Sequence, residues 1–335
     1  MHLLVTGGAG FIGSHFVRRT LDTARSEPEP VRVTVLDKLT YAGNTANLAP
    51  VADHPDLEFV RGDICDRELV ARLTHRADLV VHFAAESHVD RSIADAADFV
   101  RTNVEGTRTL LQAAADSGVR RFVHVSTDEV YGSITEGSWP EDHPVAPNSP
   151  YAATKAASDL LALAYHRTFG VPVCVTRCSN NYGPYQHPEK VVPLFTTNLL
   201  DGRPVPLYGD GRNSRDWLHV DDHCRALALV AADGRPGEVY NIGGGTELTN
   251  IELTDRLLDL CGADRSAVRH VADRAGHDLR YSVDTAKIGA ELGYAPAVDL
   301  ADGLAETVDW YRDNRSWWEP LKRPAPAPDR DPVGV

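Results

Sequence analysis

The stretch Leu3-Leu4-Val5-Thr6-Gly7-Gly8-Ala9-Gly10-Phe11-Ile12-Gly13 decides the fold of this chain. A short apolar run leads into closely spaced glycines, and a helical pattern follows to about Ala24. Glycines at such a junction let the backbone approach a pyrophosphate, and the helix N-terminus supplies amide donors and a favourable dipole. The next strand-like run, Val31 to Leu36, ends at Asp37, where the motif requires an acidic residue for the ribose hydroxyls. We therefore expect a dinucleotide site in which Asp37 repels a 2′-phosphate and favours NAD over NADP.

The same alternation of apolar runs and helical patterns continues well beyond this stretch. Further strand-like runs cover Leu57–Val60, Leu79–Phe83, Phe122–Val125 and Val171–Val175. Helical segments separate them, notably Ala94–Ser117 and Tyr151–Phe169. This order predicts an α/β fold with a Rossmann-type doubly wound parallel sheet.

The composition of the sequence changes after about Asn180, where loops rich in Gly, Pro and charged residues appear. We expect an NAD-binding domain over 1–180, rejoined by segments near 217–242, and a smaller C-terminal substrate-binding lobe over 181–323. The Pro-, Ala- and Asp-rich stretch 324–335 has no apolar period and is expected to be a flexible tail.

Composition excludes several classes of protein. The 335 residues carry 34 Lys and Arg against 48 Asp and Glu, a net charge of −14, which argues against binding to nucleic acid or an anionic membrane. No apolar run approaches the roughly 18 residues of a membrane span. Five cysteines without a CxxC pair predict no disulfide framework and fit a reducing cytoplasm. No His, Cys or Asp spacing suggests a metal site.

A second motif, Tyr151-x-x-x-Lys155, supplies a phenol and an ammonium for moving protons. Ser149 and Pro150 before it read as a helix start, which places Tyr151 and Lys155 on one helical face. The nearby ammonium and the nicotinamide charge are expected to lower the pKa of Tyr151, so that its phenolate can act as a base.

The segment Ser126-Thr127-Asp128-Glu129 should converge with this motif, because it ends the fifth strand. A simple alcohol oxidation has no use for the two carboxylates of Asp128 and Glu129. Carboxylates in different environments can hold different protonation states, one as an acid and one as a base. The pair therefore suggests a reaction that also removes a carbon-bound proton and expels a hydroxyl.

These motifs resemble those of the extended short-chain dehydrogenase/reductase family, and within it the dTDP-glucose 4,6-dehydratase group. The resemblance covers nearly the whole chain. The matching segments are TGGAGFIGS at 6–14, DKLTYAGN at 37–44, GDI at 62–64, AAESHVDRSI at 84–93, STDEVYG at 126–132, YAATKA at 151–156, RCSNNYGPYQHPEK at 177–190, LYGDGRNSRDWLHVDD at 207–222 and YNIGGG at 240–245.

The resemblance implies a mechanism in three steps. Tyr151, assisted by Lys155 and Thr127, removes the proton of the glucose 4-hydroxyl while NAD takes the hydride from C4. Glu129 then takes the C5 proton and Asp128 protonates the departing 6-hydroxyl. The hydride returns to C6 and leaves a 4-keto-6-deoxy sugar. NAD is regenerated in each turnover and should stay bound.

The resemblance also implies the binding residues. For the cofactor they are Gly7, Gly10, Phe11, Ile12, Gly13, Asp37, Lys38, Thr40, Gly43, Asp63, Ile64, Ala84, Ala85, Ser87, Thr102, Ser126, Tyr151, Lys155, Cys178 and Asn181. For the dTDP-glucose substrate they are Ser87, His88, Thr127, Asn180, Glu189, Lys190, Val191, Pro206, Tyr208, Arg215, Asn250, Arg274, His277 and Tyr281. Arg215 and Arg274 would neutralise the diphosphate; Ala275 replaces the proline that the family usually has after this second arginine.

A homodimer is implied as well, with helices over about 95–116 and 151–169 forming a four-helix bundle with a second subunit.

Three other functions remain open at this point. A sugar-nucleotide 4-epimerase shares the fold but lacks the Asp-Glu pair, a UDP-glucose 4,6-dehydratase differs only in the nucleotide, and a non-enzymatic redox sensor would bind NAD and a protein partner.

Overall fold

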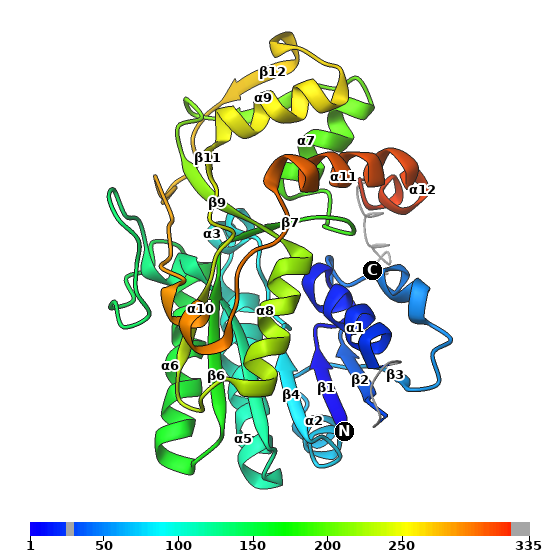
Figure 1. Cartoon of the computed structure of the whole chain (residues 1–335), viewed down its shortest axis with the longest axis vertical. Coiled ribbons are helices and arrows are strands. Elements are labelled where there is room, and N and C mark those ends of the chain that lie inside the picture. The colour runs from blue at the N-terminus through cyan, green and yellow to red at the C-terminus, as the bar shows by residue number, and fades with distance from the viewer. Residues whose placement is uncertain (25–29, 323–335) are drawn as a thin grey trace, which may run out of the picture.

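The computed structural model describes residues 1–24 and 30–322 and contains a seven-stranded sheet with the order β10-β6-β5-β4-β1-β2-β3 (Figure 1). All six strand pairs are parallel. The strands are β1 (His2–Thr6), β2 (Arg32–Asp37), β3 (Leu57–Arg61), β4 (Leu79–His82), β5 (Arg121–Thr127), β6 (Val173–Cys178) and β10 (Val239–Ile242). Strand β1 has β2 on one side and β4 on the other, so the chain direction across the sheet reverses there. The predicted doubly wound sheet is confirmed, and such a reversal opens a crevice at the carboxyl ends of the strands.

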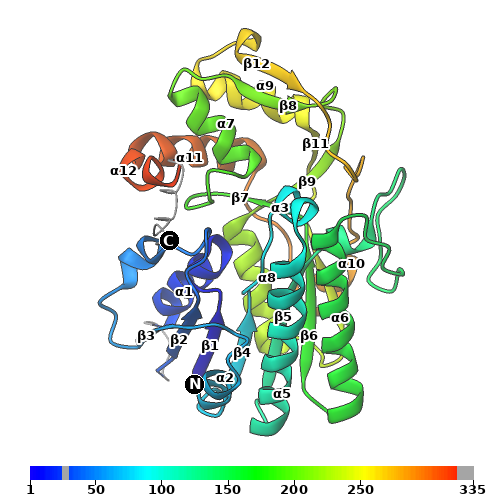
Figure 2. The ribbon, with the colours of Figure 1, turned by 180° about the vertical axis from the view of Figure 1, so that it is seen from behind.

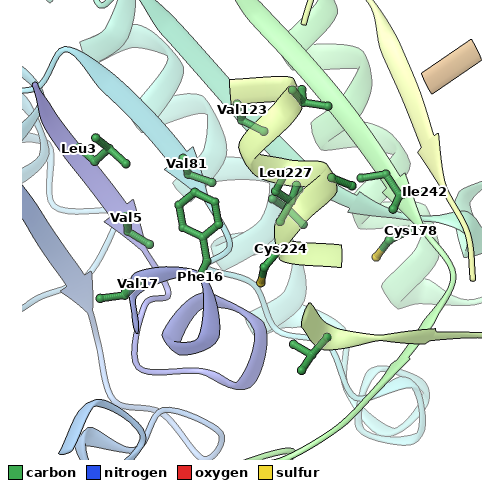
Figure 3. Packing of buried hydrophobic residues seen from close by; sticks show 14 of the residues in the cluster. Leu3, Val5, Phe16, Val17, Val81, Val123, Cys178, Cys224, Leu227 and Ile242 are labelled. Atoms are coloured by element: carbon green, nitrogen blue, oxygen red, sulfur yellow. The ribbon is translucent and has the colours of Figure 1, made fainter. Parts of the chain in front are cut away.

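Helices cover both faces of this sheet (Figures 1 and 2). One face carries α1 (Phe11–Ala24), η1 (Thr45–Val51), α8 (Val220–Asp233) and α10 (Ala286–Leu292), and the other carries α2 (Arg67–Thr74), α5 (Thr107–Ser117) and α6 (Pro150–Phe169). Figure 3 shows Phe16 of α1 and Leu227 of α8 packed against Val81 and Val123 of the sheet, and all four are buried. Burial on both faces explains why these strands read as continuous apolar runs.

The helix expected over Ala94–Ser117 begins three residues later than expected and contains a π-helical segment. Helix α3 (Val89–Ala94) ends at Asp95, which is extended and accepts a hydrogen bond from the Ala97 amide at 2.9 Å. Helix α4 (Ala97–Phe99) and a π-helical turn, η2 (Val100–Gly106), then precede α5. An Asp side chain that caps the next turn competes with the helical hydrogen bonds, which explains the break.

A second lobe lies above the carboxyl ends of the large sheet (Figure 1). It has a three-stranded sheet, β11-β9-β7, a two-stranded sheet, β12-β8, and its own buried core. Its strands are β7 (Asn180–Tyr182), β8 (Val205–Tyr208), β9 (Ser214–His219), β11 (Glu247–Thr249) and β12 (Val268–Val271). Its helices are α7 (Val191–Leu200), α9 (Asn250–Cys261), α11 (Leu300–Asp313) and α12 (Arg315–Trp318). The chain also forms short 3₁₀ turns. One is η3 (Asp128–Tyr131), which follows β5 of the large sheet, and the others are η4 (Arg265–Ala267) and η5 (Pro320–Lys322).

The chain crosses between the two parts more than once. Strand β10 pairs with β6, and α8 packs on the large sheet, whereas Trp217 lies in β9 of the three-stranded sheet and does not rejoin the large one. The domain limits themselves stay a prediction, and the expected tail over 324–335 lies outside the described residues. Within the described part, no helix combines the length and the apolar character needed to cross a membrane.

Candidate active site

A cavity lies at the carboxyl ends of the parallel strands, where the sheet reverses. Its walls come from the glycine loop after β1, the loops after β2, β3 and β4, the end of β5, the start of α6, and the segment 178–190. Every residue proposed for the cofactor lines this cavity, and so do Thr127, Asp128 and Glu129. The fold therefore brings the two motifs of the sequence to one place.

The glycine loop is packed so closely that larger residues do not fit. A Cβ on Gly13 would lie 2.3 Å from the Gly7 carbonyl oxygen. Gly7 has φ +71°, and a Cβ there would lie 2.5 Å from the Ala84 amide nitrogen. The backbone thus forms a cradle without side chains at the start of α1. This arrangement fits the pyrophosphate of a dinucleotide, which needs close backbone approach and a helix N-terminus.

Asp37 is fixed beside this cradle by two backbone amides. Its Oδ2 accepts a hydrogen bond from Ala9 N at 2.9 Å, and its Oδ1 accepts one from Leu39 N at 2.8 Å. Burial raises the pKa of the Asp37 carboxyl. Lys38 is turned away to Asp63, with Nζ 2.9 Å from Oδ2. Because Lys38 is paired, it offers little to a 2′-phosphate, which agrees with the expected preference for NAD.

Tyr151 and Lys155 lie in the first two turns of α6, as their spacing predicts. The Ser149 hydroxyl accepts a hydrogen bond from Ala152 N at 3.1 Å, and Pro150 opens the helix, so the predicted helix start is confirmed. Lys155 Nζ donates to the Val125 carbonyl at 2.8 Å, and burial lowers the Lys155 pKa to about 8.

The structure does not reproduce the expected fall in the pKa of Tyr151. Burial raises this pKa well above its ordinary value, and the charge of Glu129 raises it further, while a hydrogen bond with Thr127 lowers it. The Lys155 ammonium is directed to a backbone carbonyl, so burial and the charge of Glu129 prevail over the hydrogen bond with Thr127.

Asp128 and Glu129 occupy the 3₁₀ turn η3 at the end of β5, and their surroundings differ. Asp128 is 2% exposed, one of its oxygens accepts from the Thr127 hydroxyl at 3.3 Å, and the other oxygen is unpaired. Burial, followed by the charge of Glu129, raises its pKa well above the ordinary value. Burial also raises the pKa of Glu129, but the cations of Lys190, Arg274 and Arg215 oppose that rise. The pKa of Asp128 is therefore raised more strongly than that of Glu129, whose rise three cations oppose.

The residues proposed for the substrate fall into two groups. Ser87, Thr127, Asn180, Glu189 and Lys190 line the cavity. A second group lies beyond the cavity wall, mostly on the second lobe, and comprises His88, Val191, Pro206, Tyr208, Arg215, Asn250, Arg274, His277 and Tyr281.

Contacts inside the second group hold its cations in place. The Arg215 guanidinium lies 4.3 Å from the ring centre of Tyr281. Arg274 lies 3.7 Å from Asp90, and Tyr208 donates to the same carboxylate at 3.2 Å. The charges of both arginines lower the pKa of Glu129, which lines the cavity.

The loop in which Ala275 replaces the usual proline keeps its turn. The Asp273 carboxylate bonds His277 Nδ1 at 2.6 Å, and Gly276 supplies a φ of +62°.

Some cavity residues were missed by the reasoning from sequence, among them Tyr41, Glu86, Gln186 and His187. All four lie inside quoted motif segments, which was the signal available. Among the residues that the structure describes, no group of three or more His, Cys, Asp or Glu side chains is arranged to hold a metal ion.

Comparison with known proteins gives consistent matches. The sequence model of the GDP-mannose 4,6-dehydratase family matches residues 4–307. A dTDP-glucose 4,6-dehydratase from Streptomyces niveus is 65% identical over 97% of this chain and 96% of its own. The crystal structure of a dTDP-glucose 4,6-dehydratase from Streptomyces venezuelae with NAD bound superposes with a TM-score of 0.94 at 68% identity, covering 96% of this chain and 100% of that one. The UDP-glucose 4-epimerase of Thermotoga maritima is also similar, with a TM-score of 0.86 at 34% identity over 93% of this chain and 99% of that one.

Proposed function

The chain belongs to the GDP-mannose 4,6-dehydratase family, and we propose that it is an NAD-dependent dTDP-glucose 4,6-dehydratase. It converts dTDP-glucose to dTDP-4-keto-6-deoxyglucose and water. One observation supports this reaction most directly. Asp128 and Glu129 line the same cavity as Tyr151, Lys155 and the dinucleotide cradle. The choice of nucleotide rests on the curated relatives, because the residues around the cavity do not single out a base.

Tyr151 is the residue that takes the 4-hydroxyl proton. Its phenol lies in the cavity with Thr127 as its hydrogen-bond partner. Bound NAD supplies a hydride acceptor for C4 and a hydride donor for C6, and its positive ring adds the charge that Lys155 does not direct at the phenol. Burial keeps Tyr151 protonated until substrate and cofactor are in place, which limits proton exchange with water in the empty site.

The carboxylate pair serves the elimination. Once C4 is a ketone, the C5 proton is acidic, and Glu129 is the base, whose charged form the cations of Lys190, Arg274 and Arg215 favour. Asp128, whose pKa is raised more strongly, is the acid that protonates the departing 6-hydroxyl. Two neighbouring carboxyl groups with pKa values pushed apart are the arrangement that acid and base catalysis at one site requires.

The remaining substrate contacts follow from the same geometry. Arg215 and Arg274 bind the diphosphate, since planar guanidinium groups suit phosphate oxygens. Ser87, His88 and Asn180 contact the sugar. Glu189, Lys190 and Val191 flank the phosphates or the nucleoside, and the outer contacts are Pro206, Tyr208, Asn250, His277 and Tyr281.

The protein works as a homodimer in the cytoplasm. Val100 in η2 and Leu160 in α6 are 51% and 57% exposed, and α6 lies beside η2, so an apolar face is available for the same helices of a second copy. All five cysteines are free, which suits a reducing compartment. The mass of the purified protein by light scattering tests the dimer, and Leu160→Glu should give the mass of one chain.

Turnover with dTDP-glucose, followed by the absorbance of the 4-keto-6-deoxy product in alkali, tests the activity. Equal or faster turnover with UDP-glucose would make UDP-glucose the substrate. Inversion at C4 with retention of the 6-hydroxyl would identify an epimerase. A lack of turnover with every nucleotide sugar, despite bound NAD, would leave only a redox-sensing role.

A further inference from the structure

Four side chains from three separate segments meet at one wall of the cavity, and we refer to them as the Tyr41 cluster. Tyr41 follows β2, Arg91 lies in α3, and His187 and Glu189 lie between β7 and α7. The Arg91 guanidinium carbon lies 3.9 Å from the centre of the Tyr41 ring, and the His187 ring meets the Tyr41 ring edge-on at 5.9 Å. Arg91 Nη2 donates to Glu189 Oε2 at 2.9 Å.

The Tyr41 cluster extends from the lining of the cavity to the protein surface. Tyr41, His187 and Glu189 line the cavity. Arg91 does not line it, and its side chain is 50% exposed, whereas that of Glu189 is 16% exposed. His88 and His187 each approach the Glu189 carboxylate to 3.7 Å, and Lys190 Nζ donates to the Ser87 carbonyl at 2.9 Å. The wall is thus held by contacts between segments that are distant in sequence.

Backbone strain is found in both loops that supply this wall. In the described part of the chain, Leu39 (φ +58°) and Tyr185 (φ +69°) are the two non-glycine residues with positive φ. Leu39 lies two residues before Tyr41, and Tyr185 lies two residues before His187. Such conformations cost about 1–3 kcal/mol each and persist only where surrounding contacts enforce them. The contact between the Tyr41 and His187 rings joins these two loops at the wall of the cavity.

We propose that the Tyr41 cluster is a latch that retains the dinucleotide in the cavity through turnover, with Tyr41 and Arg91 as its closing contact. The inference rests on the proposed function, because a cofactor that takes and returns the same hydride must not leave between the steps. The glycine cradle and Asp37 line the cavity at the ends of β1 and β2, and the Tyr41 cluster adds contacts that neither motif supplies. Burial raises the Tyr41 pKa to about 12, so the ring beneath Arg91 is a neutral phenol.

The test compares Tyr41→Ala with Tyr41→Phe, which keeps the ring under Arg91. The purified protein with its bound NAD is diluted into an excess of an unrelated NAD-reducing dehydrogenase and its substrate. Released NAD is then read as near-ultraviolet absorbance. The Tyr41→Ala variant should release NAD about 3- to 30-fold faster than the parent, the range that a lost cation–π contact allows. Tyr41→Phe should release NAD at about the parent rate.

A second pair of variants checks that the two residues act together. Arg91→Gln should also speed release, while Arg212→Gln, at an arginine whose side chain is 81% exposed and remote from the cavity wall, should not. Because Tyr41 and Arg91 share one contact, the double variant should release NAD less quickly than the product of the single effects predicts. If Tyr41→Ala does not fold, Tyr41→Leu fills the volume without a π face and is expected to show the same faster release.

Release at the parent rate from both Tyr41→Ala and Tyr41→Leu would overturn the latch. So would faster release that multiplies fully in the double variant, or a change confined to KM for the nucleotide sugar, which would make the wall a substrate gate. The proposed function fails by a different result, namely tight NAD retention without dehydration of any nucleotide sugar.

Discussion

Replacing Glu129 by Gln should separate oxidation at C4 from loss of water. The side chain keeps its size but no longer accepts a proton, and a positioned general base contributes roughly 10²- to 10⁴-fold, or about 3–5 kcal/mol, to its step. Dehydration should fall by about that factor. Oxidation should not fall with it, because the charge of Glu129 raises the pKa of Tyr151 and its removal makes the Tyr151 phenolate easier to form.

The same substitution has a consequence for Asp128. Its pKa is raised first by burial and then by the charge of Glu129. Removing that charge lowers the pKa of Asp128, so the residual dehydration should lose its acid at a lower pH than in the parent. The high-pH limb of the activity profile therefore moves to lower pH in Glu129→Gln. Asp128→Asn is the matched variant, and it should slow dehydration while abolishing that limb.

The assay follows the isotopes as well as the rate. In the parent enzyme, deuterium placed at C4 of dTDP-glucose should appear at C6 of the same molecule, and deuterium from solvent should enter C5. In Glu129→Gln, rapid mixing should show the reduced cofactor building up in the near ultraviolet. Equal loss of oxidation and dehydration would refute the assignment of Glu129 to the elimination. Escape of the C4 label into solvent would refute the recycled hydride itself.

Three further predictions concern single residues. Tyr151→Phe should lower kcat by roughly 10²- to 10⁴-fold with little change in the dissociation constant of dTDP-glucose, since the phenol acts in the transition state, and a rise in KM alone would show that Tyr151 only binds. Asp37→Ala should weaken NAD retention by about 1–3 kcal/mol, roughly 5- to 150-fold by equilibrium dialysis, and unchanged retention would remove Asp37 from the site. The pKa of Asp221 is lowered to about 2 by hydrogen bonding to His15 and by Arg19, so this carboxylate stabilises the fold above its ordinary pKa near 3.8, and that contribution is lost as the pH falls towards 2. Urea titrations of Asp221→Asn should accordingly show a smaller acid-induced loss of stability, by less than about 1 kcal/mol because the partners are partly exposed, and an unchanged pH slope would count against the pair.

Local sequence patterns predicted the structural features that depend only on residues close together in the sequence. The glycine loop, the capped start of α6 and the strand end before Asp128 each follow from residues within a few positions of one another. Resemblance added the residues of the second lobe, whose positions depend on how that lobe packs.

Where the expectations from sequence differ from the structure, the cause is a contact or an environment that the local sequence pattern does not report. The break at Asp95 depends on the hydrogen bond that its exposed side chain accepts from the Ala97 amide. The pKa of Tyr151 depends on burial and on the charge of Glu129, which the spacing of Tyr151 and Lys155 does not report. Tyr41 and His187 lie in the matching motif segments, but their contact joins loops 146 residues apart, and no local pattern reports such a pairing.

The late return of the chain to its large sheet has a consequence for synthesis on the ribosome. Strand β6 is complete at residue 178, but its outer neighbour β10 begins only at residue 239. During the interval the nascent chain carries a largely apolar edge strand with unpaired amides and carbonyls, the feature that promotes edge-to-edge association. Fragments ending near residue 180 should therefore aggregate, and pausing of translation between these two points should lower the yield of native protein.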